Sequence, residues 1–205
     1  MSKRRYHTLF NVIAISLLVG IFIGYAGNNR DVLGFLDNYL KPQVTREVNP
    51  VLISDSEVAT CFTPPSGCGT VIANLISKAE KSIYVQAYGF TSGEIAKALI
   101  NARNRRVEVR VLLDKSNIGA KYSKMRDLRK AGIEVLIDEV SGIAHNKIII
   151  IDGSAVITGS FNFTTSADIR NTENVIIVQN KPLAQKYLQN WHARYEMSHA
   201  RITKN

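Results

Sequence analysis

Segments with the patterns of strands and of helices alternate along the chain from residue 58 to residue 200. The run 106–113 places Val107, Val109 and Val111 at every second position, which predicts a strand. The segment 92–104 before it has its apolar residues at helical spacing. Alternation of this kind is typical of a protein in which helices cover both faces of one sheet. The sequence therefore predicts an α/β fold, an α-β-α sandwich around a mixed, largely parallel sheet, formed by residues 58–200.

The same patterns predict the individual elements. Strands are expected at 58–62, 82–88, 106–113, 134–138, 145–151, 155–158 and 174–179. Helices are expected at 69–81, 92–104 and 122–131, followed by a last helix that opens at Pro182.

The first 57 residues have a different character. Basic residues at 3–5 precede the mostly apolar segment 9–25, and small residues at Gly24 and Ala26 are suited to signal-peptidase cleavage. Residues 1–26 are therefore expected to be either a cleaved signal peptide or a retained membrane anchor. The charges predict that the N-terminus stays in the cytoplasm and that the remainder is exported. Residues 27–57 are expected to form a spacer.

Cys61 and Cys68 are the two cysteines of the chain. In an exported protein, two cysteines this close together favour a small disulfide loop, with two buried free thiols as the alternative. Two cysteines without a neighbouring histidine supply too few ligands for zinc.

The chain is basic, with 26 Lys and Arg against 17 Asp and Glu and a formal net charge of +9. Much of the excess falls between residues 103 and 130, where only Glu108, Asp114 and Asp127 oppose a run of basic side chains. One interpretation is that these are solvated faces of helices. The other is a cationic surface that attracts a polyanion. The basic residues of this run are Arg103, Arg105, Arg106, Arg110, Lys115, Lys121, Lys124, Arg126, Arg129 and Lys130.

One group of polar residues has the composition and spacing of a catalytic site. His145 and Lys147 begin an expected strand and, being two residues apart, project from the same face. Asp152 and the glycine after it form a hairpin turn signal, so the return strand brings Ser160 and Asn162 back beside the start of the first. A neutral imidazole is a nucleophile, and the other groups supply positive charge and hydrogen-bond donors. Each residue alone suits an ordinary surface, core or turn position. Together, at this spacing, they favour attack on an anionic phosphorus centre.

These residues carry a family resemblance. The pattern H-x-K-x4-D resembles the signature of the phospholipase D superfamily, and the chain looks like the small bacterial endonucleases with one copy of that motif. The resemblance spans roughly 58–195. It includes the segments 61–65, 86–91 and 171–174 and a final helix with Trp191. In a bacterium, the leader would place the domain in the periplasm or anchor it to the outer side of the inner membrane.

The resemblance implies a mechanism. His145 would form a covalent phosphohistidine, with Lys147, Ser160 and Asn162 stabilising charge on the phosphoryl oxygens. Glu173 would fix the tautomer of His145, and Asp152 would support the histidine of the other subunit. Because the motif occurs once and the chemistry needs two histidines, a twofold homodimer is expected. No metal or other cofactor is expected.

Three functions fit this sequence. The first is a non-specific, metal-independent endonuclease on DNA or RNA, which the basic run favours. The second is a phospholipase D on membrane phospholipids, which an anchor at 9–25 would hold near its substrate. The third is a catalytically silent protein that binds nucleic acid through the cationic surface. Fold and motif alone do not separate the first two.

Overall fold

The computed structural model describes residues 51–53 and 58–202. The leader 1–26, with its apolar segment 9–25, lies outside these residues, as does most of the spacer 27–57. Residues 51–53 of that spacer form an edge strand. Within the described part of the chain, no helix combines the length and the apolar character that crossing a bilayer requires.

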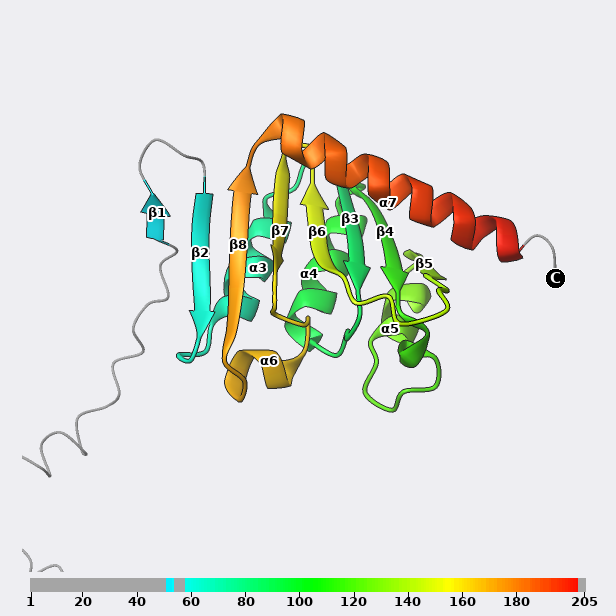
Figure 1. Cartoon of the computed structure of the whole chain (residues 1–205), viewed down its shortest axis with the longest axis horizontal. Helices are drawn as coiled ribbons and strands as arrows, with labels where there is room; N and C mark the ends of the chain where they lie inside the picture. Colours follow the sequence, from blue (N-terminus) through cyan, green and yellow to red (C-terminus); the bar gives the residue numbers. More distant parts are fainter. Residues whose placement is uncertain (1–50, 54–57, 203–205) are drawn as a thin grey trace, which may run out of the picture. The chain divides into compact units, whose positions relative to one another are not determined.

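A single mixed sheet of eight strands forms the centre of the domain (Figure 1). Its spatial order is β1-β2-β8-β7-β6-β3-β4-β5. The strands are β1 (Val51–Ile53), β2 (Val58–Thr63), β3 (Ser82–Ala87), β4 (Glu108–Leu113), β5 (Glu134–Ile137), β6 (Lys147–Ile151), β7 (Ala155–Gly159) and β8 (Glu173–Gln179).

The strand directions correct one part of the predicted fold. The sheet is mixed, as expected, but it is not largely parallel: only β3–β4 and β4–β5 pair in parallel, and the other neighbours are antiparallel. Parallel neighbours need a long crossover, which here passes through a helix. Helices α4 (Gly93–Asn104) and α5 (Met125–Lys130) provide such crossovers, whereas β6 and β7 are joined by a tight hairpin.

Helices on both faces of the sheet give the predicted sandwich. Helices α3 (Cys68–Ser77), α4 and α5 pack on one face, and the long helix α7 (Lys181–Ile202) crosses the other (Figure 1). The main apolar core lies on the side of α3 and α4, and a second cluster lies under α7. Trp191 of α7 belongs to that second cluster and donates a hydrogen bond of 2.9 Å from its Nε1 to the Val85 carbonyl oxygen. It is a core residue, as its place on the apolar face of the helix predicts.

Local sequence explains the central hairpin and the first connection. All five residues of β6 are buried. Four of them are isoleucines in a continuous run, which is typical of a strand in the middle of a sheet that helices cover on both faces. Asp152 and Gly153 both adopt positive φ, 52° and 60°, as the two central residues of a hairpin turn of this kind require. A disulfide between Cys61 and Cys68 joins β2 to the start of α3.

Candidate active site

Five of the six proposed site residues lie at one end of the sheet. Ala87 at the end of β3 pairs with Lys147 at the start of β6, and Gly159 at the end of β7 pairs with Val175 near the start of β8. The antiparallel pairing therefore brings the ends of β3 and β7 together with the starts of β6 and β8. His145, Lys147, Ser160, Asn162 and Glu173 all lie on these strand ends or within three residues of them.

The His145 ring is exposed, and the Lys147 side chain beside it is buried. The Lys147 Nζ donates a hydrogen bond of 2.9 Å to the His145 carbonyl oxygen. Tyr88 contacts both residues: its ring centroid lies 4.7 Å from that of His145, in an edge-on arrangement, and 5.5 Å from the Lys147 Nζ. This tyrosine limits where the imidazole and the ammonium can move.

The charge of Lys147 is held in a poorly solvated position. Burial lowers the pKa of the Lys147 ammonium below its ordinary value, and the nearby Glu173 carboxylate offsets part of that effect. A cation that has lost much of its water interacts more strongly with an anion that reaches it. The position therefore suits an ammonium that faces a phosphate.

Ser160 and Glu173 belong to one hydrogen-bond network. The Ser160 hydroxyl donates to Glu173 Oε2 at 2.6 Å and accepts from the backbone N–H of Asn174 at 3.0 Å. The other carboxylate oxygen of Glu173 accepts from the Asn171 Nδ2 at 2.8 Å. Glu173 was expected to fix a ring nitrogen of His145. In this chain its two oxygens are instead bonded to Ser160 and Asn171.

Asn162 keeps an unused hydrogen-bonding group at the site. Its Oδ1 is buried and, among the described residues, has no hydrogen-bond partner. A Cβ atom at Gly89 would lie 3.6 Å from that oxygen, so the segment after β3 packs closely against Asn162. A buried polar group without a partner is costly unless a ligand or water completes it. Because this oxygen is an acceptor, the partner that would complete it is a donor such as a water molecule.

Gly159 allows β7 to approach β8 closely. It has a φ of 143°, which side-chain-bearing residues rarely adopt, and a Cβ there would lie 2.3 Å from the Asn174 carbonyl oxygen. That carbonyl also accepts from the backbone N–H of Ser160 at 3.1 Å. The glycine therefore sets the position of Ser160, its chain neighbour.

The structure does not bring Asp152 together with the other five residues. It lies in the turn after β6, at the end of that strand opposite His145. Its carboxylate accepts hydrogen bonds from the backbone N–H groups of Glu80, Lys81 and Ser82, at 3.0, 2.7 and 2.9 Å. The hairpin that delivers Ser160 and Asn162 to His145 necessarily places its own turn at the far end.

Asp114 is a buried carboxylate that lies outside the H-x-K-x4-D motif. Its Oδ2 accepts from the backbone N–H of Ala144 at 2.7 Å, next to His145, and its Oδ1 accepts from Ser116 N–H at 2.9 Å. Burial alone would raise the pKa of Asp114. These hydrogen bonds, with the charge of Lys115, hold the pKa below its ordinary value. The carboxylate thus ties the His145 loop to the end of β4.

Eight of the ten basic residues between 103 and 130 fall into two groups. Arg103, Arg105 and Arg129 bond to backbone carbonyl oxygens, and Arg110 pairs with Glu108 and Glu134. A second group lies in the connection from β4 to α5 and the first turn of α5 and consists of Lys115, Lys121, Lys124 and Arg126. Within it, the Lys115 Nζ donates to the Val140 carbonyl oxygen at 3.4 Å and Lys124 pairs with Asp127. That connection leaves β4 at the same end of the sheet as Tyr88, because β3 and β4 are parallel with Ala87 opposite Leu113. The interpretation as a cationic surface stays a prediction for the residues of this second group.

No group of three or more His, Cys, Asp and Glu side chains suited to a metal ion occurs in the described residues. The arrangement as a whole offers one exposed imidazole, one buried ammonium, a hydroxyl in a carboxylate network and the side-chain amide of Asn162. These groups suit nucleophilic attack on a phosphodiester with stabilisation of its oxygens.

Known proteins resemble this chain along most of its length. Residues 72–194 match the family described as "Cardiolipin synthase, PLD-like domain". The chain is 51% identical over 192 residues to a protein named Phospholipase D from Rickettsia conorii, covering 92% of this chain and 96% of that protein. It is 31% identical over 152 residues to a mitochondrial cardiolipin hydrolase from Xenopus laevis, covering 73% and 71%. Among solved structures, Nuc from Salmonella typhimurium, a phospholipase D family member, superposes with a TM-score of 0.65 at 33% identity, covering 68% of this chain and 93% of Nuc.

Proposed function

Because the chain belongs to the phospholipase D superfamily, we propose that it is a metal-independent phosphodiesterase that cleaves nucleic acid. The observation that carries the proposal is that the exposed His145 imidazole and the buried, poorly solvated Lys147 ammonium lie at one strand end. The connection that carries the cations of 115–126 leaves β4 at the same end of the sheet. An imidazole supplies the nucleophile, and the ammonium supplies a charge for the phosphoryl oxygens.

The proposed reaction has two steps. In the first, a ring nitrogen of His145 attacks phosphorus, a P–N bond forms, the P–O bond to the leaving oxygen breaks, and a second imidazole gives that oxygen a proton. In the second, this imidazole takes a proton from water, the water oxygen attacks phosphorus, and the P–N bond breaks to release a phosphate monoester. Lys147 and the Asn162 amide stabilise the negative charge on the non-bridging oxygens in both steps.

The second imidazole is the reason for proposing a homodimer. The described part of the chain contains two other histidines, and both lie on α7: His192 packs against Tyr84 and Trp191, and His199 stacks on Tyr195. A twofold arrangement that brings together two copies of the strand end with His145 supplies the missing acid and base. It also supplies a second lysine and a second asparagine.

Charge favours nucleic acid over a lipid as the substrate. Lys115, Lys121, Lys124 and Arg126 lie on the connection beside the site, where a polynucleotide presents repeated negative charges and a phospholipid presents few. The second candidate is a phospholipase D. The observation in its favour is the name of the Rickettsia conorii relative, which matches over nearly the whole chain.

One assay separates these functions. The full chain is incubated, with excess EDTA, with plasmid DNA, with RNA and with phosphatidylcholine vesicles. Three proteins are compared: the natural protein, His145→Ala, and His199→Ala as a matched control for an exposed histidine on α7. We expect cleavage of nucleic acid that survives EDTA, disappears in His145→Ala and persists in His199→Ala. Turnover of lipid without cleavage of nucleic acid would refute the nuclease.

The dimer has its own test. Light scattering during chromatography measures the mass of the active species. We expect twice the chain mass of 22.8 kDa, and an enzyme that is active as a strict monomer would contradict the shared site.

A further inference from the structure

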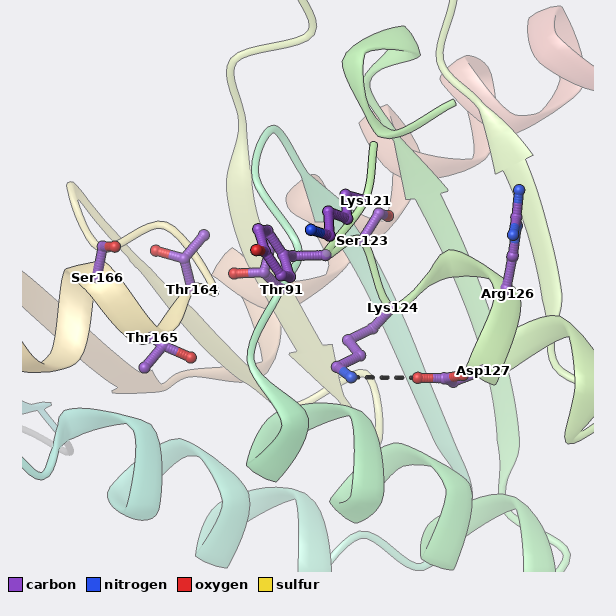
Figure 2. Close-up of a pocket in the computed structure, with 10 residues that line it drawn as sticks. Thr91, Lys121, Ser123, Lys124, Arg126, Asp127, Thr164, Thr165 and Ser166 are labelled. Carbon is purple, nitrogen blue, oxygen red and sulfur yellow. Dashed lines mark ion pairs between the residues drawn. The ribbon is translucent and has the colours of Figure 1, made fainter. Parts of the chain in front are cut away.

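A pocket of about 790 Å³ opens beside the candidate active site (Figure 2). We call it the side pocket. Three segments line it: Thr91 after β3, residues between 121 and 127 at the start of α5, and residues 164–166 at the start of α6 (Thr165–Ile169). Its wall mixes polar and apolar surface, and its polar groups are hydroxyl groups from one side and cationic side chains from the other.

The segments that line the side pocket are hydrogen-bonded to, or packed against, the segment that contains Asn162. Thr164 follows Asn162 closely, and its backbone N–H donates to the Asn162 carbonyl oxygen at 2.7 Å. A Cβ atom at Gly89 would lie 3.1 Å from the Thr164 methyl group and 3.6 Å from Asn162 Oδ1. The Thr91 and Lys124 backbone N–H groups donate to Phe163 and Phe90, at 2.9 and 3.0 Å. A molecule in the pocket would therefore be a near neighbour of one bound at Asn162.

The charges of the side pocket attract an anion. Lys121, Lys124 and Arg126 carry three positive charges, and Asp127 carries one negative charge, which leaves two positive charges in excess. The Lys124 Nζ lies 3.3 Å from Asp127 Oδ2, so part of its charge is already neutralised (Figure 2). The Lys121 Nζ lies 5.3 Å from the centre of the Tyr122 ring. Ammonium groups opposite hydroxyl groups are typical partners of a phosphate group.

Tyr122 adds a feature that a simple phosphate site does not need. Its side chain is 70% exposed, although it is a large aromatic ring at the rim of a pocket. An exposed ring beside ammonium groups is how proteins stack an unpaired base while they hold its phosphate. The pocket thus combines contacts for both parts of a nucleotide.

We propose that the side pocket binds a nucleotide next to the scissile bond: Lys121 and Lys124 hold its phosphate and the Tyr122 ring stacks on its base. This inference rests on the proposed function, because it assigns the substrate of that site to a chain of nucleotides. The scissile phosphate lies at His145 and Asn162, and the neighbouring nucleotide enters the side pocket. A small phosphodiester occupies only the first of these positions.

The test compares a single-stranded 12-mer oligonucleotide with bis(p-nitrophenyl) phosphate. The variant is Lys121→Ala/Lys124→Ala in the full chain. Its control is Lys181→Ala/Lys186→Ala, which removes the same charge from exposed positions on α7. We expect kcat/KM for the oligonucleotide to fall roughly tenfold in the pocket variant, through KM. In a plot of log kcat/KM for the oligonucleotide against the logarithm of the salt concentration, the slope should become shallower. The expected change is roughly 0.7 for each phosphate that is no longer neutralised. For the small diester, kcat/KM of the pocket variant should fall far less. In the control variant, kcat/KM should change little for either substrate.

Two further variants sharpen the test. Tyr122→Ala should weaken oligonucleotide binding about tenfold, because the base no longer has a ring to stack on. Asp127→Asn should strengthen binding a few-fold, because it frees the Lys124 ammonium, and a gain of affinity is not a product of misfolding.

Several results would overturn the proposal. Equal losses on both substrates would place the lysines at the scissile phosphate, and an equal loss in the α7 control would show a general effect of charge. A loss confined to phospholipid vesicles would assign the pocket to a headgroup. If the natural protein hydrolyses neither diester, the proposed function fails by itself. The binding of a fluorescent oligonucleotide, measured by anisotropy in the same variants, then decides the pocket.

Discussion

Asp152, the last residue of the H-x-K-x4-D pattern, is expected to contribute stability and not catalysis. It lies seven residues after His145 along an extended strand, which separates the two by roughly 20 Å. Its carboxylate accepts three hydrogen bonds from the backbone N–H groups of residues 80–82, which lead into β3. These hydrogen bonds fasten the central hairpin to the start of β3, so removing them should lower the free energy of unfolding.

The magnitude follows from the hydrogen bonds. Hydrogen bonds to a charged group contribute about 1.5–3 kcal/mol each when buried, and the partial exposure of Asp152 reduces this to about 1 kcal/mol each. Asp152→Ala removes all three and places alanine at a φ of 52°, which costs about 1 kcal/mol more. The total is about 4 kcal/mol. Asp152→Asn keeps one oxygen and tolerates that φ, so it should lower the stability by about 1–2 kcal/mol.

The assay follows unfolding in urea through the fluorescence of Trp191, the single tryptophan, which is buried under α7. Both variants should remain folded at 25 °C, since domains of this size are stable by about 5–15 kcal/mol. We expect kcat per folded molecule to change less than about twofold. His145→Asn should show the reverse, with kcat abolished and stability kept. A tenfold drop of kcat in Asp152→Asn at an unchanged unfolding midpoint would show that Asp152 acts in catalysis and not in stability.

Three other residues give predictions. Asp114→Asn should lower stability by about 2 kcal/mol and lower kcat, because it weakens the anchor of the His145 loop. The folded-state pKa of Asp114 is depressed, so the stability it contributes is complete above the unfolded pKa and is lost as pH falls through the folded one. The free energy of unfolding in urea, measured from pH 7 to pH 3, should therefore depend less on pH in Asp114→Asn than in the natural protein. Burial depresses the pKa of Lys147. We therefore expect kcat/KM to decline at alkaline pH, and to do so below the pH range in which lysines ordinarily lose their proton. A decline at or above that range would contradict the role of the Lys147 ammonium in the reaction. Gly159→Ala should destabilise the domain by at least about 2 kcal/mol and reduce activity, because its methyl group meets the Asn174 carbonyl. Gly142→Ala, where the added methyl meets open space, is the control.

The sequence predicts local structure here better than the arrangement of strands. The α/β class, the hairpin at Asp152 and Gly153 and the helix ahead of β4 follow from patterns within a few residues. The pairing of β2 with β8 joins Thr63 to Glu173 across most of the domain, and no local pattern reveals it. The short helix α6 was also missed, because its five residues are too few to show an apolar period.

The same contrast holds within the candidate site. His145, Lys147, Ser160 and Asn162 converge through one hairpin, so spacing alone predicts that they share a strand end. Glu173 entered only through a family resemblance, and its actual partners, Ser160 and Asn171, depend on the β7–β8 pairing. Tyr88 and Asp114 reach the His145 loop from β3 and β4. Finding them requires the order of the strands.

His145 is proposed to form a covalent bond to phosphorus, and trapping that bond is a direct test of this step. The full chain is mixed with a 5′-labelled oligonucleotide in EDTA, quenched in alkaline detergent within milliseconds to seconds, and digested for peptide mass analysis. Alkaline conditions are chosen because a phosphoramidate is stable to base and labile to acid. We expect an acid-labile adduct on His145, at no more than one for each pair of chains. Steady hydrolysis with no adduct, or with the adduct on another residue, would contradict it.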